Sequence, residues 1–178
     1  MNTYIALLKG INVGGHKKVP MIALRELLKE LGYHDIQTYI QSGNVIFKTE
    51  ERNIQKIEDT ISTSVKKHFG FEVLVLVKTR EDLKRIFEAS PFPEEQKKAS
   101  YFMMLHHKPE QVLIDKVSEK VYEGETYEII NDCIYYFYEK GLGQAKFNVN
   151  FFERKLNTFA TARNYNTLVK LLSLSLEN

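Results

Sequence analysis

The first half of the chain alternates between strand patterns and amphipathic helix patterns. Residues 3–8 are apolar on both alternating sets, which predicts a strand that is buried on both faces. After a glycine-rich loop, apolar residues recur at helical spacing over 21–31, and Pro20 and Gly32 mark the two ends of this helix. The remaining elements predicted in this half are strands over 37–41, 44–49 and 72–78 and a helix over 54–69 that stops at Gly70.

The resulting element order, β-α-β-β-α-β, is that of the ferredoxin-like fold. Ser42-Gly43 is typical of a two-residue hairpin turn between the second and third strands. In this fold the end of the first strand and the hairpin lie at the same edge of the sheet. We therefore expect the glycine-rich loop, residues 9–18, to lie beside residues 41–44, although the two stretches are far apart in sequence.

The second half begins the same pattern again after two prolines in 90–93 break a helix predicted over 80–89. Its predicted elements are strands over 101–106, 126–130, 133–139 and 158–162, a turn at Asn131-Asp132, and helices from Pro109 to Val121, over 150–156 and after a cap at Asn164 or Asn166. We expect an α+β fold of two ferredoxin-like βαββαβ repeats with a C-terminal helix. The expected domains are 1–79, the first repeat; 80–99, a connecting helix and linker; and 100–178, the second repeat with its terminal helix.

The run Tyr135-Tyr136-Phe137-Tyr138 places aromatic rings on both faces of one predicted strand. RNA-binding ferredoxin-like domains stack bases on exposed sheet aromatics, but rings packed in a core follow the same pattern. Core packing is favoured, because several strands are apolar on both faces. Each sheet should then be covered by the other repeat or by a second subunit, so both a monomer and a homodimer are open.

Composition places the chain among ordinary globular proteins. Of its 178 residues 43% are hydrophobic, and the single cysteine, Cys133, excludes an intramolecular disulfide. Because Cys133 lies in an apolar strand, we expect a buried structural thiol. The N-terminus has no signal-peptide pattern and no apolar run is long enough to span a bilayer, so we expect a cytoplasmic protein without a membrane partner.

Charge is distributed unevenly, although the formal net charge is only +2. Residues 1–80 carry 12 basic against 8 acidic side chains, residues 81–140 carry 8 against 13, and residues 141–178 carry 5 against 2. A polyanion should therefore prefer a surface built from the two ends of the chain. Ordinary solvated surface charge explains the same asymmetry.

Residues 9–18 carry the clearest functional signal. Three glycines permit backbone geometry that other residues resist, and successive N–H groups in such a loop can form an anion site. Lys17, Lys18 and His16 add positive charge. The loop matches neither the Walker A nor the dinucleotide-binding spacing, so neither ATP nor NAD is inferred and no cofactor is expected. A tight structural turn with a basic flank is the alternative.

Two further polar clusters accompany the loop. Gln41, Ser42 and Asn44 either orient a ligand or satisfy their own hairpin, and Ser42 already fits the hairpin role. Arg163 opposes the dipole of the helix it precedes, so it either shares an anion with that helix N-terminus or flanks two asparagine caps, Asn164 and Asn166, and a packed tyrosine.

Histidine spacing does not indicate a metal site. His106 and His107 are adjacent at a predicted strand end, so their side chains should point to opposite faces. We therefore expect no metal ligands.

Three motifs together resemble the bacterial family known as domain of unknown function 1697. They are Ala6–Gly15, Tyr39–Val45 and Ala160–Thr167. In this family arginine usually stands where this chain has Lys9, and tryptophan where it has Tyr165, so a bidentate contact of the arginine would be lost here. The resemblance implies a soluble bacterial alpha/beta protein without an assigned activity.

Three functions fit these observations. The first is a binding module for a phosphorylated small molecule or a polyanion such as nucleic acid. The second is an enzyme on a small anionic metabolite, with His16 as proton carrier. The third is a non-catalytic assembly or regulatory protein. The residues predicted to contact a ligand are Lys9, Asn12, Gly14, Gly15, His16, Lys17, Lys18, Gln41, Asn44, Arg163 and Asn164.

Overall fold

The first repeat is a four-stranded antiparallel sheet with two helices. The computed structural model describes residues 1–177. The elements of the first repeat are β1 (Asn2–Leu8), α1 (Met21–Glu30), β2 (His34–Tyr39), β3 (Asn44–Thr49), α2 (Ile54–Phe69) and β4 (Val75–Thr79). The strand order is β2-β3-β1-β4, and every neighbouring pair is antiparallel. This order is the ferredoxin-like arrangement that the sequence predicts.

The second repeat has the same topology. Its elements are β5 (Tyr101–Leu105), α5 (Gln111–Ser118), β6 (Glu125–Ile130), β7 (Cys133–Tyr138), a short 3-10 helix η1 (Leu142–Gln144), α6 (Val149–Leu156) and β8 (Ala160–Asn164). Helices α3 (Arg80–Glu88) and α4 (Glu94–Lys98) connect the repeats, and α7 (Tyr165–Glu177) follows β8. The strand order β6-β7-β5-β8 repeats that of the first sheet, so the prediction of two repeats with a C-terminal helix is confirmed.

The chain divides into two compact units. Unit 1 is Met1–Lys84 with the end of the chain from Lys170, and unit 2 is Arg85–Val169. The domain boundaries expected from the sequence stay a prediction.

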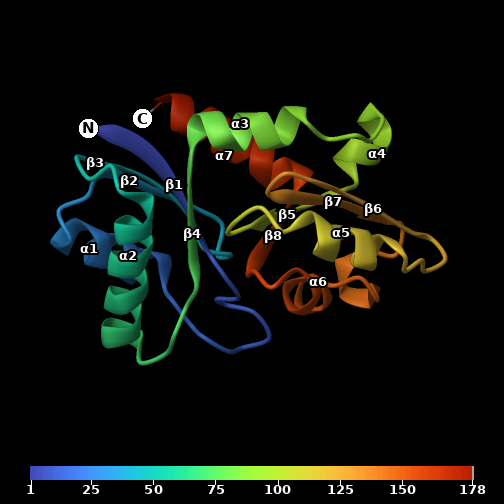
Figure 1. Cartoon of the computed structure of the whole chain (residues 1–178). Helices are drawn as coiled ribbons and strands as arrows, with labels where there is room; N and C mark the ends of the chain where they lie inside the picture. The colour runs from blue at the N-terminus through green and yellow to red at the C-terminus, as the bar shows by residue number, and fades with distance from the viewer. Residues whose placement is uncertain (178) are drawn as a thin grey trace. The chain divides into compact units, whose positions relative to one another are not determined.

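Both faces of the central strands of unit 1 are buried. Tyr4, Ala6 and Leu8 of β1 face α1 and α2, with which they share a core (Figure 1). The alternate residues Ile5 and Leu7 are also fully buried. Full burial of one such side chain stabilises the fold by roughly 1.5–3 kcal/mol. The apolar residues on both sides of β1 therefore correspond to two packed faces.

The aromatic run of β7 belongs to the core of unit 2. Tyr136 lies among the buried side chains that face α5 and α6. Tyr135 points to the other face, where its hydroxyl donates to the Ile86 carbonyl of α3 at 2.7 Å and its ring meets Phe102 at 5.7 Å. Phe87 of α3 stacks on Phe102. The core reading is therefore confirmed for Tyr135 and Tyr136.

Cys133 is fully buried, as expected for a structural thiol.

Several predicted boundaries are wrong for local reasons. Strand β2 runs over His34–Tyr39 rather than 37–41. The β2–β3 connection has four residues, 40–43, because Tyr39 pairs with Asn44, so the predicted two-residue turn at Ser42-Gly43 does not form. Helix α5 ends at Ser118, because the Tyr127 hydroxyl and the Lys120 N–H occupy the Val117 carbonyl, and Val121 is exposed.

The predicted boundaries of the last strand are also wrong. β8 runs over Ala160–Asn164 rather than 158–162, since Asn157 ends α6 in the left-handed conformation at φ 52° and pairing starts at Ala160. The turn at Asn131-Asp132 is confirmed, because Ile130 pairs directly with Cys133.

Glu51, just before α2, gives one testable pH dependence. Its carboxylate binds the Lys56 ammonium at 2.6 Å and accepts the N–H groups of Asn53 and Arg52, and these bonds lower its pKa from 4.5 to about 2. Because the folded pKa lies below the unfolded one, the stabilisation is present above about pH 4.5 and is lost as pH falls towards 2.

We expect Glu51→Gln to flatten the fall in melting temperature between these pH values. Glu26→Gln, at an exposed glutamate of α1, is the control and should keep the wild-type slope. Melting curves at closely spaced pH values test this, and equal slopes in wild type and Glu51→Gln would contradict it.

Candidate anion-binding site

Residues 12–17 of the glycine-rich loop form a small β-hairpin. The Asn12 N–H donates to the Lys17 carbonyl at 3.1 Å, and the His16 N–H donates to the Val13 carbonyl at 3.0 Å. The two residues at the tip, Gly14 and Gly15, have φ of 58° and 78°. A two-residue turn of type I′ requires positive φ at both positions, so turn geometry accounts for these glycines.

The Asn12 side chain links this hairpin to Val19 and to the β2–β3 loop by hydrogen bonds. Its Nδ2 donates to the Val19 carbonyl at 3.0 Å and to the Gln41 carbonyl at 2.7 Å, and its Oδ1 accepts the Val19 N–H at 2.8 Å. The Leu8 N–H also donates to the Gly43 carbonyl at 2.8 Å. The prediction that the loop lies beside residues 41–44 is therefore confirmed, and Asn12 acts as the joint between them.

Asn44 closes the β2–β3 loop from within. Its side chain is fully buried, and Nδ2 donates to the Tyr39 carbonyl at 3.0 Å and to Ser42 Oγ at 2.9 Å. These bonds favour the structural reading of Asn44 and Ser42. Gln41 meets the hairpin through its main-chain carbonyl.

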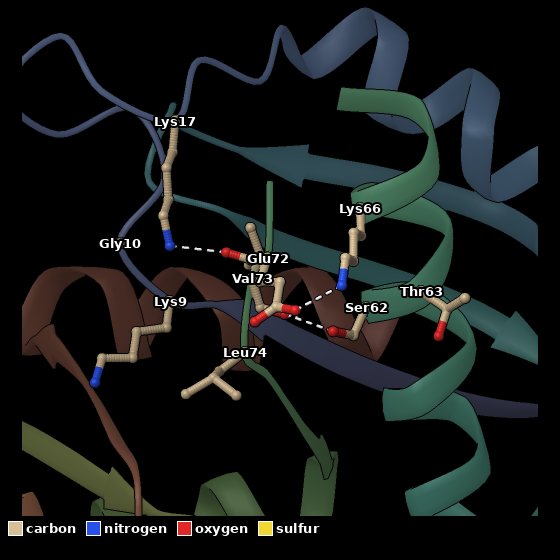
Figure 2. A pocket seen from close by; sticks show the side chains of 9 residues that line it. All are labelled: Lys9, Gly10, Lys17, Ser62, Thr63, Lys66, Glu72, Val73 and Leu74. Carbon is tan, nitrogen blue, oxygen red and sulfur yellow. Dashed lines mark hydrogen bonds and ion pairs between the residues drawn. The ribbon is translucent and has the colours of Figure 1, made fainter. Parts of the chain in front are cut away.

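A hollow of about 690 Å³ lies at the base of the hairpin (Figure 2). It is lined by Lys9, Gly10, Lys17, Ser62, Thr63, Lys66, Glu72, Val73 and Leu74. These residues come from the loop after β1, the second half of α2 and the segment before β4. Three lysines against one glutamate give the hollow a formal excess of two positive charges.

Glu72 is the centre of the polar contacts in this hollow. Lys17 Nζ donates to the Glu72 carbonyl at 2.7 Å, and Lys66 Nζ pairs with Glu72 Oε1 at 2.6 Å. Figure 2 shows both side chains directed at Glu72, whereas Lys9 extends away from it. The hydrogen bond and the charge of Lys66, with a smaller contribution from Lys17, hold the pKa of Glu72 below its ordinary value, so this carboxylate stays charged.

The main-chain carbonyls of residues 72–74 bind groups of the glycine-rich loop and of α2. The Val73 carbonyl accepts the Ser62 hydroxyl at 2.7 Å, and the Leu74 carbonyl accepts the Lys9 N–H at 2.9 Å. With Lys17 on the Glu72 carbonyl, all three carbonyls are occupied from the loop or from α2. Side chains bind the carbonyls of Glu72 and Val73, so these two residues do not extend β4, which starts at Val75 and not at the predicted residue 72.

The structure separates the predicted ligand residues. Lys9 and Lys17 line the hollow, whereas Gly14, Gly15, His16 and Lys18 are exposed and do not line it. The residues that sequence reasoning missed are Ser62, Thr63, Lys66 and Glu72. Their signal was present, because the predicted topology brings the end of α2 and the start of β4 to the sheet edge that carries the loop.

Arg163 and Asn164 lie in unit 2. Arg163 is buried, its Nη1 donates to Thr161 Oγ1 at 2.7 Å and to the Ala162 carbonyl at 2.8 Å, and burial lowers its pKa to about 10. Asn164 Oδ1 accepts the Thr167 N–H at 2.9 Å, which is the expected cap of α7. The Tyr165 ring packs on Phe87, with centroids 5.3 Å apart. An anion shared by Arg163 and the N-terminus of α7 stays a prediction.

The sequence predicted that the side chains of His106 and His107 point to opposite faces, and this prediction is wrong. β5 ends at Leu105, so strand alternation no longer governs them, and both line one hollow with ring centroids 6.0 Å apart. Within residues 1–177 no group of three or more His, Cys, Asp or Glu side chains is placed to hold a metal ion. The same residues contain no helix both long and apolar enough to cross a bilayer.

Fold and site together define an α+β protein of duplicated ferredoxin-like repeats with a lysine-lined hollow in the first repeat. The chain belongs to the family described as protein of unknown function DUF1697, whose sequence model matches residues 1–135. It is also similar in structure to the conserved bacterial protein SP0830 from Streptococcus pneumoniae, with a TM-score of 0.70 and 24% identity over 97% of this chain and 98% of that one. This likeness concerns the fold alone. No curated protein matches the chain.

Proposed function

We propose that the chain binds a phosphorylated ligand in the hollow at the base of the hairpin. The observation that carries the proposal is the lining itself, in which Lys9, Lys17 and Lys66 outnumber one carboxylate. Ammonium groups are suitable partners for phosphate as point charges. The volume of about 690 Å³ also falls within the range of about 300–1,000 Å³ that is common for small-molecule sites.

Binding is favoured over catalysis by the chemistry of the lining. None of the described residues that line the hollow is a histidine, and His16 is exposed on the hairpin. The one carboxylate, Glu72, has a lowered pKa because Lys66 binds it, which makes it a weak proton acceptor near neutral pH. The enzyme hypothesis thus lacks a proton carrier at this hollow.

A thermal-shift panel is the first test. It compares inorganic phosphate, AMP, glucose 6-phosphate and short single- and double-stranded oligonucleotides. A ligand at one hundred times its dissociation constant adds about 2.7 kcal/mol to the stability of the folded state. We expect a small phosphorylated compound to raise the melting temperature. Stabilisation by oligonucleotides alone would assign the surface to nucleic acid, and no shift with any compound would contradict the proposal.

Two neighbouring lysines allow a matched charge reversal. Lys17 lines the hollow and Lys18 does not, although both are exposed. We expect Lys17→Glu to weaken binding of the best compound roughly tenfold or more, because it replaces an attraction at the site by a repulsion. Lys18→Glu makes the same change in net charge and should alter affinity by less than about twofold in moderate salt.

Calorimetric titration of both variants measures the two affinities, and their melting temperatures without ligand check that both are folded. Equal losses in the two variants would show that general surface charge, and not the hollow, attracts the ligand.

A further inference from the structure

In unit 1, two backbone hydrogen bonds at one sheet edge lie beside the hollow, and together they are called the frame. The Leu8 N–H at the end of β1 donates to the Gly43 carbonyl of the β2–β3 loop at 2.8 Å. The next N–H, that of Lys9, donates to the Leu74 carbonyl just before β4 at 2.9 Å. These two bonds fix the direction in which the chain leaves the sheet, and Lys9 is the first residue beyond it.

Unit 2 contains the same frame with different side chains. The Leu105 N–H at the end of β5 donates to the Asp132 carbonyl of the β6–β7 turn at 2.8 Å, and the His106 N–H donates to the Phe159 carbonyl just before β8 at 2.9 Å. His106 therefore holds the position in the second repeat that Lys9 holds in the first. The fold thus presents a second edge of the same construction.

A hollow of about 460 Å³ opens at this second edge. Its lining residues are Arg85, His106, His107, Lys108, Asn131 and Asp132. They comprise two cations, Arg85 and Lys108, two imidazoles, one carboxylate and one neutral amide. The formal charge of the lining is therefore +1 with both histidines neutral and +3 with both protonated.

Several of these side chains are held in place. The His106 ring stacks on Phe159, with centroids 4.5 Å apart and an angle of 22° between the planes. Arg85 Nη2 of α3 pairs with Asp132 Oδ1 at 2.9 Å, and this carboxylate is only 15% exposed. The ring stack and the ion pair thus hold an imidazole and a guanidinium at the same hollow before any ligand arrives, which lowers the entropy lost on binding.

We propose that this hollow is a second anion site, which takes a phosphoryl or sulfate dianion and binds it more tightly as His106 and His107 gain protons. Each imidazole that gains a proton adds one positive charge to the lining beside the anion, and histidine is the side chain suited to such a change near physiological pH. Every residue of the site lies in unit 2, so the proposal does not depend on the function assigned to the hollow of unit 1.

The charged groups around the two histidines act in opposite directions. Arg85 from α3 and Lys108 from the same loop attract the anion, and Asp132 from the β6–β7 turn repels it but is bound by Arg85. Glu153, the carboxylate of α6, accepts the Ala160 N–H at 2.8 Å and does not line the hollow. Protonation of the imidazoles therefore changes the balance in favour of the anion.

Sulfate is the suitable probe, because it stays doubly charged throughout this pH range. We expect a titration followed by ¹H–¹⁵N NMR at pH 5.5 to shift the backbone amides of residues 105–108 and 131–132, with an affinity about tenfold higher than at pH 8. Amides of Gly10, Lys17 and Glu72 report on the hollow of unit 1 in the same spectra. Shifts confined to that hollow, or equal affinities at the two pH values, would overturn the proposal.

The double variant His106→Gln with His107→Gln tests the cause of the pH dependence. It should bind sulfate with the same weak affinity at both pH values, whereas His34→Gln, at an exposed histidine of β2, should keep the wild-type difference. Lys108→Glu leaves the His106 stack intact and should weaken binding several-fold at both pH values, so the site can be tested even if the double variant does not fold. A pH dependence that survives in the double variant would refute the assignment.

Discussion

Gly43→Ala is expected to lower the free energy of unfolding by about 4 kcal/mol. A Cβ at this position would lie 2.8 Å from Leu8 Cβ and 3.0 Å from both Ile11 Cδ1 and the Leu8 carbonyl oxygen, and φ is +78°. Left-handed geometry costs an alanine roughly 1–2 kcal/mol, and forcing atoms into a packed site costs roughly 1–3 kcal/mol more. Moving Gly43 away would also stretch the hydrogen bond from Leu8 to its carbonyl.

Gly10→Ala separates these two effects. Gly10 has a similar φ of +68°, but an added Cβ would meet no atom within 4 Å. This variant should therefore lose only the conformational part, about 1–2 kcal/mol. Urea unfolding curves of wild type and both variants give the comparison. If Gly43→Ala and Gly10→Ala were equally destabilising, the close approach of the β2–β3 loop to β1 would be wrong.

The fold was predictable because apolar residues recur at regular strand or helix spacing over long stretches of the chain. Two-sided apolar strands and one-sided helices occur twice in the same order, and this order leaves few topologies to consider. Boundaries failed where a single side chain decided them. The Tyr127 hydroxyl ends α5 by taking the Val117 carbonyl, and the carbonyl of Glu72 binds Lys17 in place of a strand partner.

The position of the candidate site was predictable from the sequence, but only some of its residues were. Topology alone brought the glycine-rich loop to the β2–β3 loop, and the bond from Asn12 to Gln41 confirms this. The same reasoning, extended to the segment between α2 and β4, would have added Lys66 and Glu72. Which exposed lysine faces the hollow depends on the hairpin twist, and the sequence does not distinguish Lys17 from Lys18.

The burial of Arg163 could not be predicted from composition. An arginine beside a helix start fits an anion site as well as a structural role, and only the packed environment tells them apart. Here the side chain is buried and donates to Thr161 and Ala162 of its own strand. A charged group is retained in such a place only when hydrogen bonds offset its loss of water.

Asn12→Ala is expected to destabilise unit 1 by about 3–4 kcal/mol. The change removes three hydrogen bonds, two to the main chain of Val19 and one to the Gln41 carbonyl. Each such bond contributes roughly 1 kcal/mol net. Asn12 also has a φ of 56°, a conformation that asparagine tolerates and alanine resists by about 1 kcal/mol.

Asn12→Gly removes the same three hydrogen bonds but accepts the positive φ. It should therefore be less destabilising than Asn12→Ala by about 1 kcal/mol, while still losing about 3 kcal/mol relative to wild type. Urea unfolding of both variants measures the two contributions separately. A glycine variant as stable as wild type would mean that Asn12 is present only for its backbone conformation. Other bonds, such as that from the Leu8 N–H to the Gly43 carbonyl, would then hold the β2–β3 loop beside the hairpin that carries Lys17.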